Sequence, residues 1–200
     1  MASDSTPQPG RLVLARHGAT EWSRSGRHTG RSDVGLDEGG RQQAECLGRC
    51  LAAYSFTEVI VSPLRRTVET AEIAGLMGRA TLSADLMEWD YGDYEGLTTA
   101  QIRAERPGWS IWDDGVPGGE TLEQVAERAG RIVARTRMVS GDVLLVAHAH
   151  LLRVLAACWL EAKPGFGRHL VLGPASLSVL AWEREEPVIS SWNASSGTPG

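Results

Sequence analysis

Arginine and histidine residues gather directly after three predicted strands, and their types and spacing could do chemistry. The predicted strands span residues 11–15, 58–62 and 143–147, each a short run of mainly apolar residues. The cationic residues that follow them are Arg16, His17, Arg65, Arg66, His148 and His150. The carboxyl ends of parallel strands share one edge of a sheet, and ligands of such sheets bind outside that edge. We therefore expect a pocket for a multiply charged anion, and phosphate fits it best.

Helices are expected to begin after two of these strand ends, where their N-terminal N–H groups would add donors for the anion. Ser62 is expected to cap one of these helices, with Pro63 in its first turn. A metal site at His148 and His150 is disfavoured because supporting carboxylates and zinc motifs are missing. The sequence also has no P-loop and no Gly-x-Gly-x-x-Gly fingerprint, which argues against nucleotide triphosphate hydrolysis and dinucleotide binding.

Strands and helices alternate along the chain, which predicts an α/β fold. We expect a three-layer sandwich, with a mostly parallel sheet flanked by helices. Further strands are predicted at 80–86, 176–182 and 187–192, the last two as a hairpin. Helices are predicted at 37–54, 63–77, 97–106, from 121 onward and at 150–161. Thr121 and Gln124 have the spacing of a capping box.

The length of 200 residues fits a single domain, which we place at residues 11–192. Residues 97–120 contain a stretch rich in Gly and Pro and are expected to form a lid-like segment. Residues 1–10 and 193–200 are small and polar, and we expect loose tails there.

Composition and charge argue against several classes of protein. The net charge of −5 disfavours a nucleic-acid partner. No apolar run is long enough to span a membrane. The first ten residues lack the features of a secretory signal, so we expect a cytoplasmic protein. The three cysteines have neither disulfide nor zinc spacing, and they are expected to pack as free thiols.

Four segments, in order, resemble the motifs of the histidine phosphatase superfamily, the phosphoglycerate mutase-like enzymes. The first is Leu12-Val-Leu-Ala-Arg-His-Gly-Ala-Thr-Glu-Trp-Ser23, and the second is Ser62-Pro-Leu-Arg-Arg-Thr-Val-Glu-Thr-Ala71. The third is Glu88-Trp-Asp-Tyr-Gly-Asp-Tyr-Glu-Gly-Leu97, and the fourth is Leu144-Leu-Val-Ala-His-Ala-His-Leu-Leu-Arg153. The resemblance implies a phosphoglycerate mutase-like fold over most of the chain. The sequence departs from the usual pattern of the family at Ala149, where Gly is common, and at Ser23, where mutases often have Asn.

The resemblance implies five catalytic residues. His17 attacks phosphorus and becomes phosphohistidine. Arg16 and Arg66 hold the phosphoryl oxygens, and His148 donates to the same oxygens as an imidazolium in the loaded state. Glu88 protonates the leaving alkoxide and then deprotonates the attacking water.

Other residues near these motifs are expected to contact substrate or to stay outside the site. The substrate-binding residues implied are Thr29, Gly30, Tyr91 and Trp22. Further aromatic candidates for a substrate rim are Trp89, Trp109 and Trp112. The carboxylates beside Glu88, which spacing alone does not exclude as the acid, are Asp90, Asp93 and Glu95. Arg65 is expected to face outward.

The favoured activity is metal-independent hydrolysis of a small phosphomonoester, with no cofactor. A sugar phosphate or sugar bisphosphate is expected because the motifs resemble broad acid phosphatases and sedoheptulose-bisphosphatases. Residues 97–119 are short and contain only Arg103 and Arg106 as cations, which suits hydrolysis better than mutase chemistry. A 2,3-bisphosphoglycerate-dependent phosphoglycerate mutase is the alternative, and a non-catalytic phosphoester-binding module is a third possibility. A homodimer is a further expectation.

Overall fold

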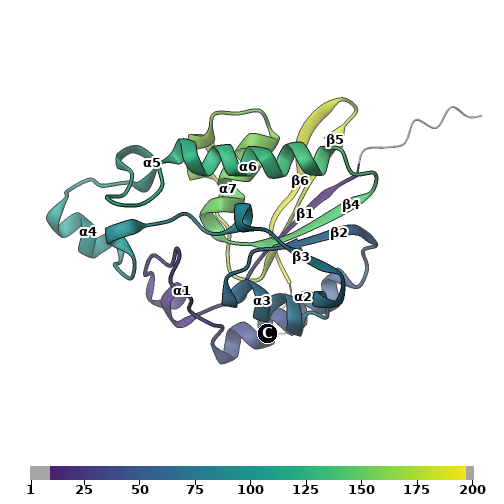
Figure 1. Cartoon of the computed structure of the whole chain (residues 1–200), viewed down its shortest axis with the longest axis horizontal. Helices are drawn as coiled ribbons and strands as arrows, with labels where there is room; N and C mark the ends of the chain where they lie inside the picture. The colour runs from purple at the N-terminus through teal and green to yellow at the C-terminus, as the bar shows by residue number, and fades with distance from the viewer. Residues whose placement is uncertain (1–9, 197–200) are drawn as a thin grey trace, which may run out of the picture.

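A six-stranded sheet lies between two layers of helices in the computed structural model, which describes residues 10–196 (Figure 1). The strands are β1 (Leu12–Arg16), β2 (Phe56–Val61), β3 (Ala80–Leu82), β4 (Asp142–Ala147), β5 (Ser176–Glu183) and β6 (Glu186–Ser195). Their order across the sheet is β3-β2-β4-β1-β5-β6. The predicted α/β sandwich is therefore confirmed.

Parallel pairing dominates the centre of the sheet, as expected. Strands β3, β2, β4 and β1 pair in parallel, whereas β5 and β6 form an antiparallel hairpin beside β1. The predicted strand at 80–86 is shorter, because the 3-10 helix η2 (Ala84–Leu86) follows β3. The hairpin is longer than predicted, and residues 193–195 belong to β6 rather than to a loose tail. The remaining tail predictions, for residues 1–9 and 197–200, lie outside the described residues.

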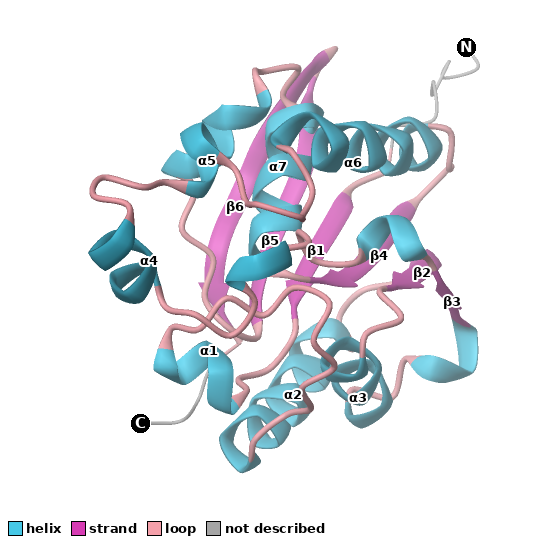
Figure 2. Cartoon of the chain, turned by 60° about the vertical axis from the view of Figure 1, so that its left-hand side comes forward, coloured by secondary structure: helices cyan, strands magenta, loops and turns pink. Residues whose placement is uncertain are grey.

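Two helices cover each face of the sheet (Figure 2). On one face lie α2 (Glu38–Leu51) and α3 (Arg65–Ile73), and on the other lie α6 (Leu122–Arg137) and α7 (Ala149–Trp159). The short helices α1 (Glu21–Ser25), α4 (Thr99–Glu105) and α5 (Ile111–Asp114) lie outside these layers. The other 3-10 helices are η1 (Met77–Arg79), η3 (Gly92–Tyr94) and η4 (Pro164–His169). No helix in the described part of the chain is both long and apolar enough to cross a membrane.

The alternation of side chains along β1 divides the core into two clusters. Leu12 and Leu14 join the cluster under α6 and α7, whereas Val13 and Ala15 join the cluster under α2 and α3. All four side chains are at most 1% exposed. Because helices cover both faces, β1 is a continuous apolar run rather than an alternating one.

Local signals were correct at one helix start and wrong at another. Thr121 and Gln124 form the predicted capping box of α6. Ser62 does not cap α3: that helix begins at Arg65, and its N-cap residue Leu64 makes no side-chain hydrogen bond. The Ser62 hydroxyl instead contacts a histidine of the candidate site, described below.

The segment 97–120 is anchored to the core. Ile102, Trp109 and Ile111 are at most 5% exposed and belong to the cluster under α6 and α7. The predicted lid-like segment therefore packs as part of the domain through three apolar side chains. The three cysteines, Cys46, Cys50 and Cys158, are free.

A buried arginine of α6 holds the loop that precedes the third motif, which begins at Glu88. Arg128 is 5% exposed, and it donates to the carbonyl oxygens of Asp85 (3.0 Å) and Met87. Its Nε and Nη2 groups also donate to both carboxylate oxygens of Glu120, at 2.8 and 2.9 Å. Bidentate pairing of this kind fixes orientation as well as distance.

We expect Arg128→Met to reduce the free energy of unfolding by about 3–5 kcal/mol, because it leaves buried acceptors and a carboxylate without their cation. Denaturant unfolding measures the change. Arg131→Met on the same helix is the matched control. Arg131 pairs with Asp85 and Glu127, but its side chain is 54% exposed, so little change is expected. Equal losses in the two variants would contradict this account of Arg128.

Candidate active site

The register of the central strands brings three predicted site segments to one edge of the sheet. Arg16 pairs with Ala147 across β1 and β4, and the backbone N–H of His17 donates to Ala147 O at 3.1 Å. On the other side of β4, the N–H of Ser62 donates to Val146 O at 3.0 Å. The residues that follow β1, β2 and β4 are therefore neighbours, as the sequence predicted.

His17 is held as a neutral imidazole with a defined tautomer. It is 5% exposed, and its Nδ1 lies 2.7 Å from the carbonyl oxygen of Gly18. A carbonyl oxygen only accepts, so Nδ1 carries the proton and Nε2 keeps its lone pair. Burial, followed by the charges of Arg66 and Arg16, lowers the pKa of His17 well below its usual value. This ring can therefore act as a nucleophile through Nε2.

Arg16 contributes a buried donor group that has no partner among residues 10–196. Its Nη1 donates to Leu172 O at 2.6 Å, which fixes the guanidinium, whereas its Nε makes no hydrogen bond there. Burial lowers the pKa of Arg16 from its ordinary value. Buried N–H groups are almost always paired, so an unpaired one beside His17 indicates a place for an oxyanion.

Arg66 is fully buried, and most of its N–H groups donate to acceptors of the protein itself. Nη1 donates to Ser32 O at 3.0 Å, and Nη2 donates to the carbonyl oxygens of Thr29 and Gly30, each at 2.9 Å. Nε donates to Nδ1 of His148 at 3.1 Å. Arg66 thus ties the 29–32 loop to the site and orients the second histidine. Its expected contact with phosphoryl oxygens stays a prediction.

His148 is neutral in the structure, and the imidazolium expected in the phosphate-loaded state stays a prediction. Because the Arg66 guanidinium can only donate, Nδ1 of His148 must be the acceptor. The proton therefore lies on Nε2, which donates to the Ser62 hydroxyl oxygen at 2.7 Å. Burial and the nearby charges of Arg66, His17 and Arg16 lower the pKa of His148 well below its usual value. The His17 and His148 rings face each other with centroids 5.2 Å apart.

Glu88 occupies the N-terminus of α7. Its Oε2 accepts from the backbone N–H of His150 at 3.1 Å, and its Oε1 accepts from Leu151 N–H at 2.9 Å and Trp89 N–H at 3.0 Å. The first turn of a helix is a favourable place for a carboxylate, because its N–H groups carry positive partial charge. The N–H groups of His150 and Leu151 are therefore paired with Glu88, and the expected contact of this helix end with an anion stays a prediction.

The start of α3 is occupied in the same way. The first helical N–H, that of Arg65, donates to the Asp33 carboxylate at 2.8 Å. The N–H group of Arg65 is therefore paired within the protein and is not a free donor for an anion.

The structure distinguishes Glu88 from its three rival carboxylates. Glu88 lines the pocket that contains His17, and none of Asp90, Asp93 and Glu95 does. Asp90 accepts from Gly92 N–H and pairs with Arg31 at 3.6 Å. Glu95 accepts from the N–H groups of residues 31 and 32, and Asp93 is exposed. Among these four, only Glu88 shares a pocket with the predicted nucleophile.

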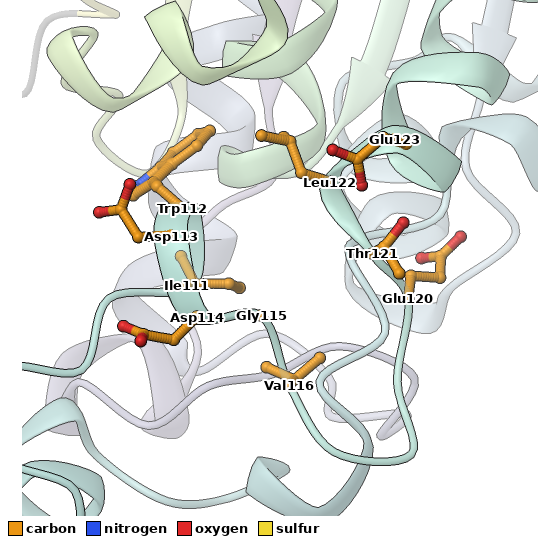
Figure 3. A pocket seen from close by; sticks show the side chains of 10 residues that line it. All are labelled: Ile111, Trp112, Asp113, Asp114, Gly115, Val116, Glu120, Thr121, Leu122 and Glu123. Carbon is orange, nitrogen blue, oxygen red and sulfur yellow. The ribbon is translucent and has the colours of Figure 1, made fainter.

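That pocket has a volume of ≈ 200 Å³. It is lined by Arg16, His17, Ser23, Gly26, Arg27, His28, Thr29, Glu88, Tyr91, Ala149 and His150. A larger cavity, of ≈ 310 Å³, lies between α5 and the start of α6 (Figure 3). It contains none of the five predicted catalytic residues, so the smaller pocket is the candidate active site.

The four predicted substrate-binding residues divide into two pairs. Thr29 and Tyr91 line the pocket. Gly30 does not: a Cβ there would approach Glu95 Oε1 to 2.1 Å and Trp89 O to 2.5 Å, so glycine is required for close packing of the loop. Trp22 packs against Gly96 and the Arg27 guanidinium instead of lining the pocket.

The predicted aromatic rim is also only partly present. Trp89 is fully buried in the core, and its Nε1 donates to Glu120 O at 2.8 Å. Trp109 and Trp112 line a neighbouring cavity that shares two residues with the pocket.

Sequence reasoning missed His28 and the pairing of His150. The His28 ring packs on Tyr91 with centroids 4.8 Å apart, and His150 Nδ1 lies 2.6 Å from the Tyr91 hydroxyl. Both rings line the pocket, and burial lowers both pKa values. The signal available for His28 in the sequence was its position directly before Thr29, a predicted substrate-binding residue. Nothing local in the sequence indicated that His150 would meet Tyr91, 59 positions earlier.

Residues 12–195 match the family model of the histidine phosphatase superfamily (branch 1). The chain belongs to this superfamily. An acid phosphatase of Mycobacterium tuberculosis (strain ATCC 25618 / H37Rv) is 44% identical over 177 residues, which are 86% of this chain and 87% of that protein. The sedoheptulose 1,7-bisphosphatase of Saccharomyces cerevisiae (strain ATCC 204508 / S288c) is 34% identical over 182 residues, 74% of this chain and 67% of that protein.

A solved structure supports the same membership. The product of a Mycobacterium tuberculosis open reading frame is similar to this chain with a TM-score of 0.89 and 40% sequence identity. The similarity covers 94% of this chain and 99% of that one. The predicted fold, superfamily and phosphatase class of this histidine phosphatase are thus confirmed. No group of three or more His, Cys, Asp or Glu side chains suited to a metal ion occurs within residues 10–196.

We expect Arg66→Ala to lower kcat/KM by about 10²–10³, because it removes charge near the phosphoryl group and releases both His148 and the 29–32 loop. Arg65→Ala is the adjacent control. The Arg65 side chain is 57% exposed and pairs with Glu69 at 2.7 Å, so a loss of about tenfold or less is expected. Steady-state kinetics with one aryl phosphate compares the two variants. A larger loss in Arg65→Ala would contradict the assignment.

Proposed function

We propose that this histidine phosphatase hydrolyses a small sugar phosphate, without a metal ion, through a phosphohistidine at His17. The observation that carries the proposal is the buried neutral His17 ring, whose Nδ1–H is committed to Gly18 O while Nε2 remains available. The acid phosphatase and sedoheptulose 1,7-bisphosphatase relatives support a phosphomonoester of a sugar as substrate. Cytoplasmic residence and a homodimer stay predictions of the sequence.

In the first step, a bond forms between His17 Nε2 and phosphorus while the bond from phosphorus to the ester oxygen breaks. The departing oxygen takes a proton from the Glu88 carboxyl group, which lies in the same pocket. Arg16, whose Nε–H has no partner within residues 10–196, and Arg66 stabilise charge on the phosphoryl oxygens. The Nδ1–H group of His17 keeps its hydrogen bond to Gly18 O, so the ring keeps its orientation throughout.

In the second step, water attacks phosphorus and gives its proton to the Glu88 carboxylate. The bond from phosphorus to Nε2 breaks, and His17 returns to its neutral tautomer. Charge that a bound metal ion would otherwise supply comes from the two guanidinium groups.

We therefore expect full activity in the presence of a chelator.

The Glu88→Gln variant tests whether Glu88 protonates the leaving group, because leaving groups differ in their need for a proton. An alkoxide is a strong base and needs a proton in the transition state, whereas a nitrophenolate leaves without one. General acid assistance contributes about 10²–10⁴ in rate. We expect single-turnover formation of phosphohistidine from an alkyl phosphate to slow by most of that factor, with little change for an aryl phosphate.

His17→Ala is the companion variant, and it should form no phosphoenzyme from either substrate while keeping the thermal melting curve of a folded protein. Equal slowing of both substrates by Glu88→Gln would overturn the acid assignment. Hydrolysis by His17→Ala within tenfold of the unmodified protein would overturn the nucleophile.

A further inference from the structure

Two successive peptide groups next to His17 are held by side chains from the two helices on one face of the sheet. The backbone N–H of Gly18 donates to the hydroxyl oxygen of Thr70, on α3, at 3.1 Å. The N–H of Ala19 donates to Oε1 of Gln43, on α2, at 2.8 Å. A backbone N–H can only donate, so the side-chain amide of Gln43 presents its oxygen to the loop. The loop that carries His17 is therefore fixed from both helices.

Close backbone packing of α2 against this loop places Gln43. A Cβ added at Gly40 would lie 2.0 Å from Ala19 O, and one added at Gly18 would lie 2.3 Å from Gly40 O. A larger residue at either position would push the helix and the loop apart. The N–H of Asp37, the N-cap residue of α2, also donates to Ala19 O at 3.1 Å. Gln43 follows Gly40 by about one helical turn, so its side chain reaches the loop from a fixed position.

The hydrogen bond of Gln43 is connected to His17 through a single peptide group. The N–H of Ala19 and the carbonyl of Gly18 are the two polar ends of that planar group. Its N–H donates to Gln43 Oε1, and its carbonyl oxygen accepts the proton of His17 Nδ1 at 2.7 Å. A hydrogen bond at the N–H end polarises a peptide group and makes its carbonyl oxygen a stronger acceptor. The Gln43 amide therefore strengthens the contact that holds the His17 ring.

We propose that Gln43 is a positioning residue for the nucleophile, which holds this peptide group so that the carbonyl oxygen keeps the His17 proton on Nδ1. The lone pair then stays on Nε2, the atom proposed to attack phosphorus. As the bond from Nε2 to phosphorus forms, positive charge develops on the ring, and a polarised oxygen at Nδ1 stabilises that charge. The inference rests on the proposed function. Gln43 does not line the catalytic pocket, so it acts without touching substrate.

The Gln43→Met variant removes the acceptor and keeps a long, unbranched side chain. We expect formation of phosphohistidine from an aryl phosphate, measured in a single turnover, to slow about tenfold, the effect of one hydrogen bond. The affinity for inorganic phosphate should not change, because the arginines proposed to bind it remain. Gln42→Met is the matched control. Gln42 is exposed and its Nε2 contacts Glu38 at 3.5 Å, so no slowing is expected.

Proton NMR of the His17 ring measures the strength of the hydrogen bond at Nδ1. In Gln43→Met the Nδ1 proton resonance should move upfield, because a weaker hydrogen bond deshields its proton less. Gln43→Glu places a carboxylate, which is a stronger acceptor, at the same distance along the side chain. The resonance should then move downfield, and the rate of phosphohistidine formation should not fall. A merely structural role would affect both variants in the same direction.

An unmoved Nδ1 proton in Gln43→Met, or equal slowing by Gln43→Met and Gln43→Glu, would overturn the inference. The contact itself can also be tested in the unmodified protein, without any variant and without activity. We expect a spin coupling across the hydrogen bond between the Ala19 backbone nitrogen and the side-chain carbonyl carbon of Gln43, and its absence would likewise overturn the inference.

The same experiments distinguish failure of the inference from failure of the proposed function. If the unmodified protein forms phosphohistidine and Gln43→Met forms it equally fast, the inference fails and the proposed phosphatase stands. If the unmodified protein forms no phosphohistidine, the proposed function fails and the inference fails with it.

Discussion

Burial of imidazole rings beside guanidinium groups is the constraint on which the rest of this site depends. A protonated His17 would add a third cation next to Arg16 and Arg66 in a place that water barely reaches, so the neutral ring is strongly favoured. His148 is held neutral for the same reason and accepts from Arg66. The site therefore separates two tasks: the arginines carry positive charge, and the ring of His17, the proposed nucleophile, remains uncharged.

The fold creates this environment through strand register and through internal carboxylates. The pairing of β4 with β1 and β2 sets the separation of the three strand ends, and the two apolar clusters hold the sheet rigidly between its helices. Glu88 then occupies the N-terminus of α7, and Arg128 on α6 holds the loop that leads to Glu88. The proposed proton donor is thereby placed in the pocket by contacts from two helices, without being a neighbour of His17 in sequence.

Strand ends and fold class could be predicted because they depend on local patterns of apolar runs followed by polar residues, whereas the choice of His17 as nucleophile rests on the family resemblance and stays a prediction. What the sequence could not indicate depended on distant partners. Ser62 reads locally as a helix cap but contacts His148, and the helix N-termini read as open anion sites but bind Glu88 and Asp33. Similarly, no local rule distinguished Glu88 from Asp90 or indicated that His150 would pair with Tyr91. These outcomes are set by packing between segments 30 to 90 positions apart in the chain.

Nitrogen NMR of the His17 ring tests the central claim most directly, because the ¹⁵N shifts report both the charge and the tautomer. We expect a neutral ring with the proton on Nδ1, unchanged as the pH falls from 8 through the ordinary histidine pKa of about 6.5. The His17→Gln variant, which lacks these signals, assigns them. Protonation with a midpoint near that ordinary value, or a proton on Nε2 in the neutral ring, would contradict the account.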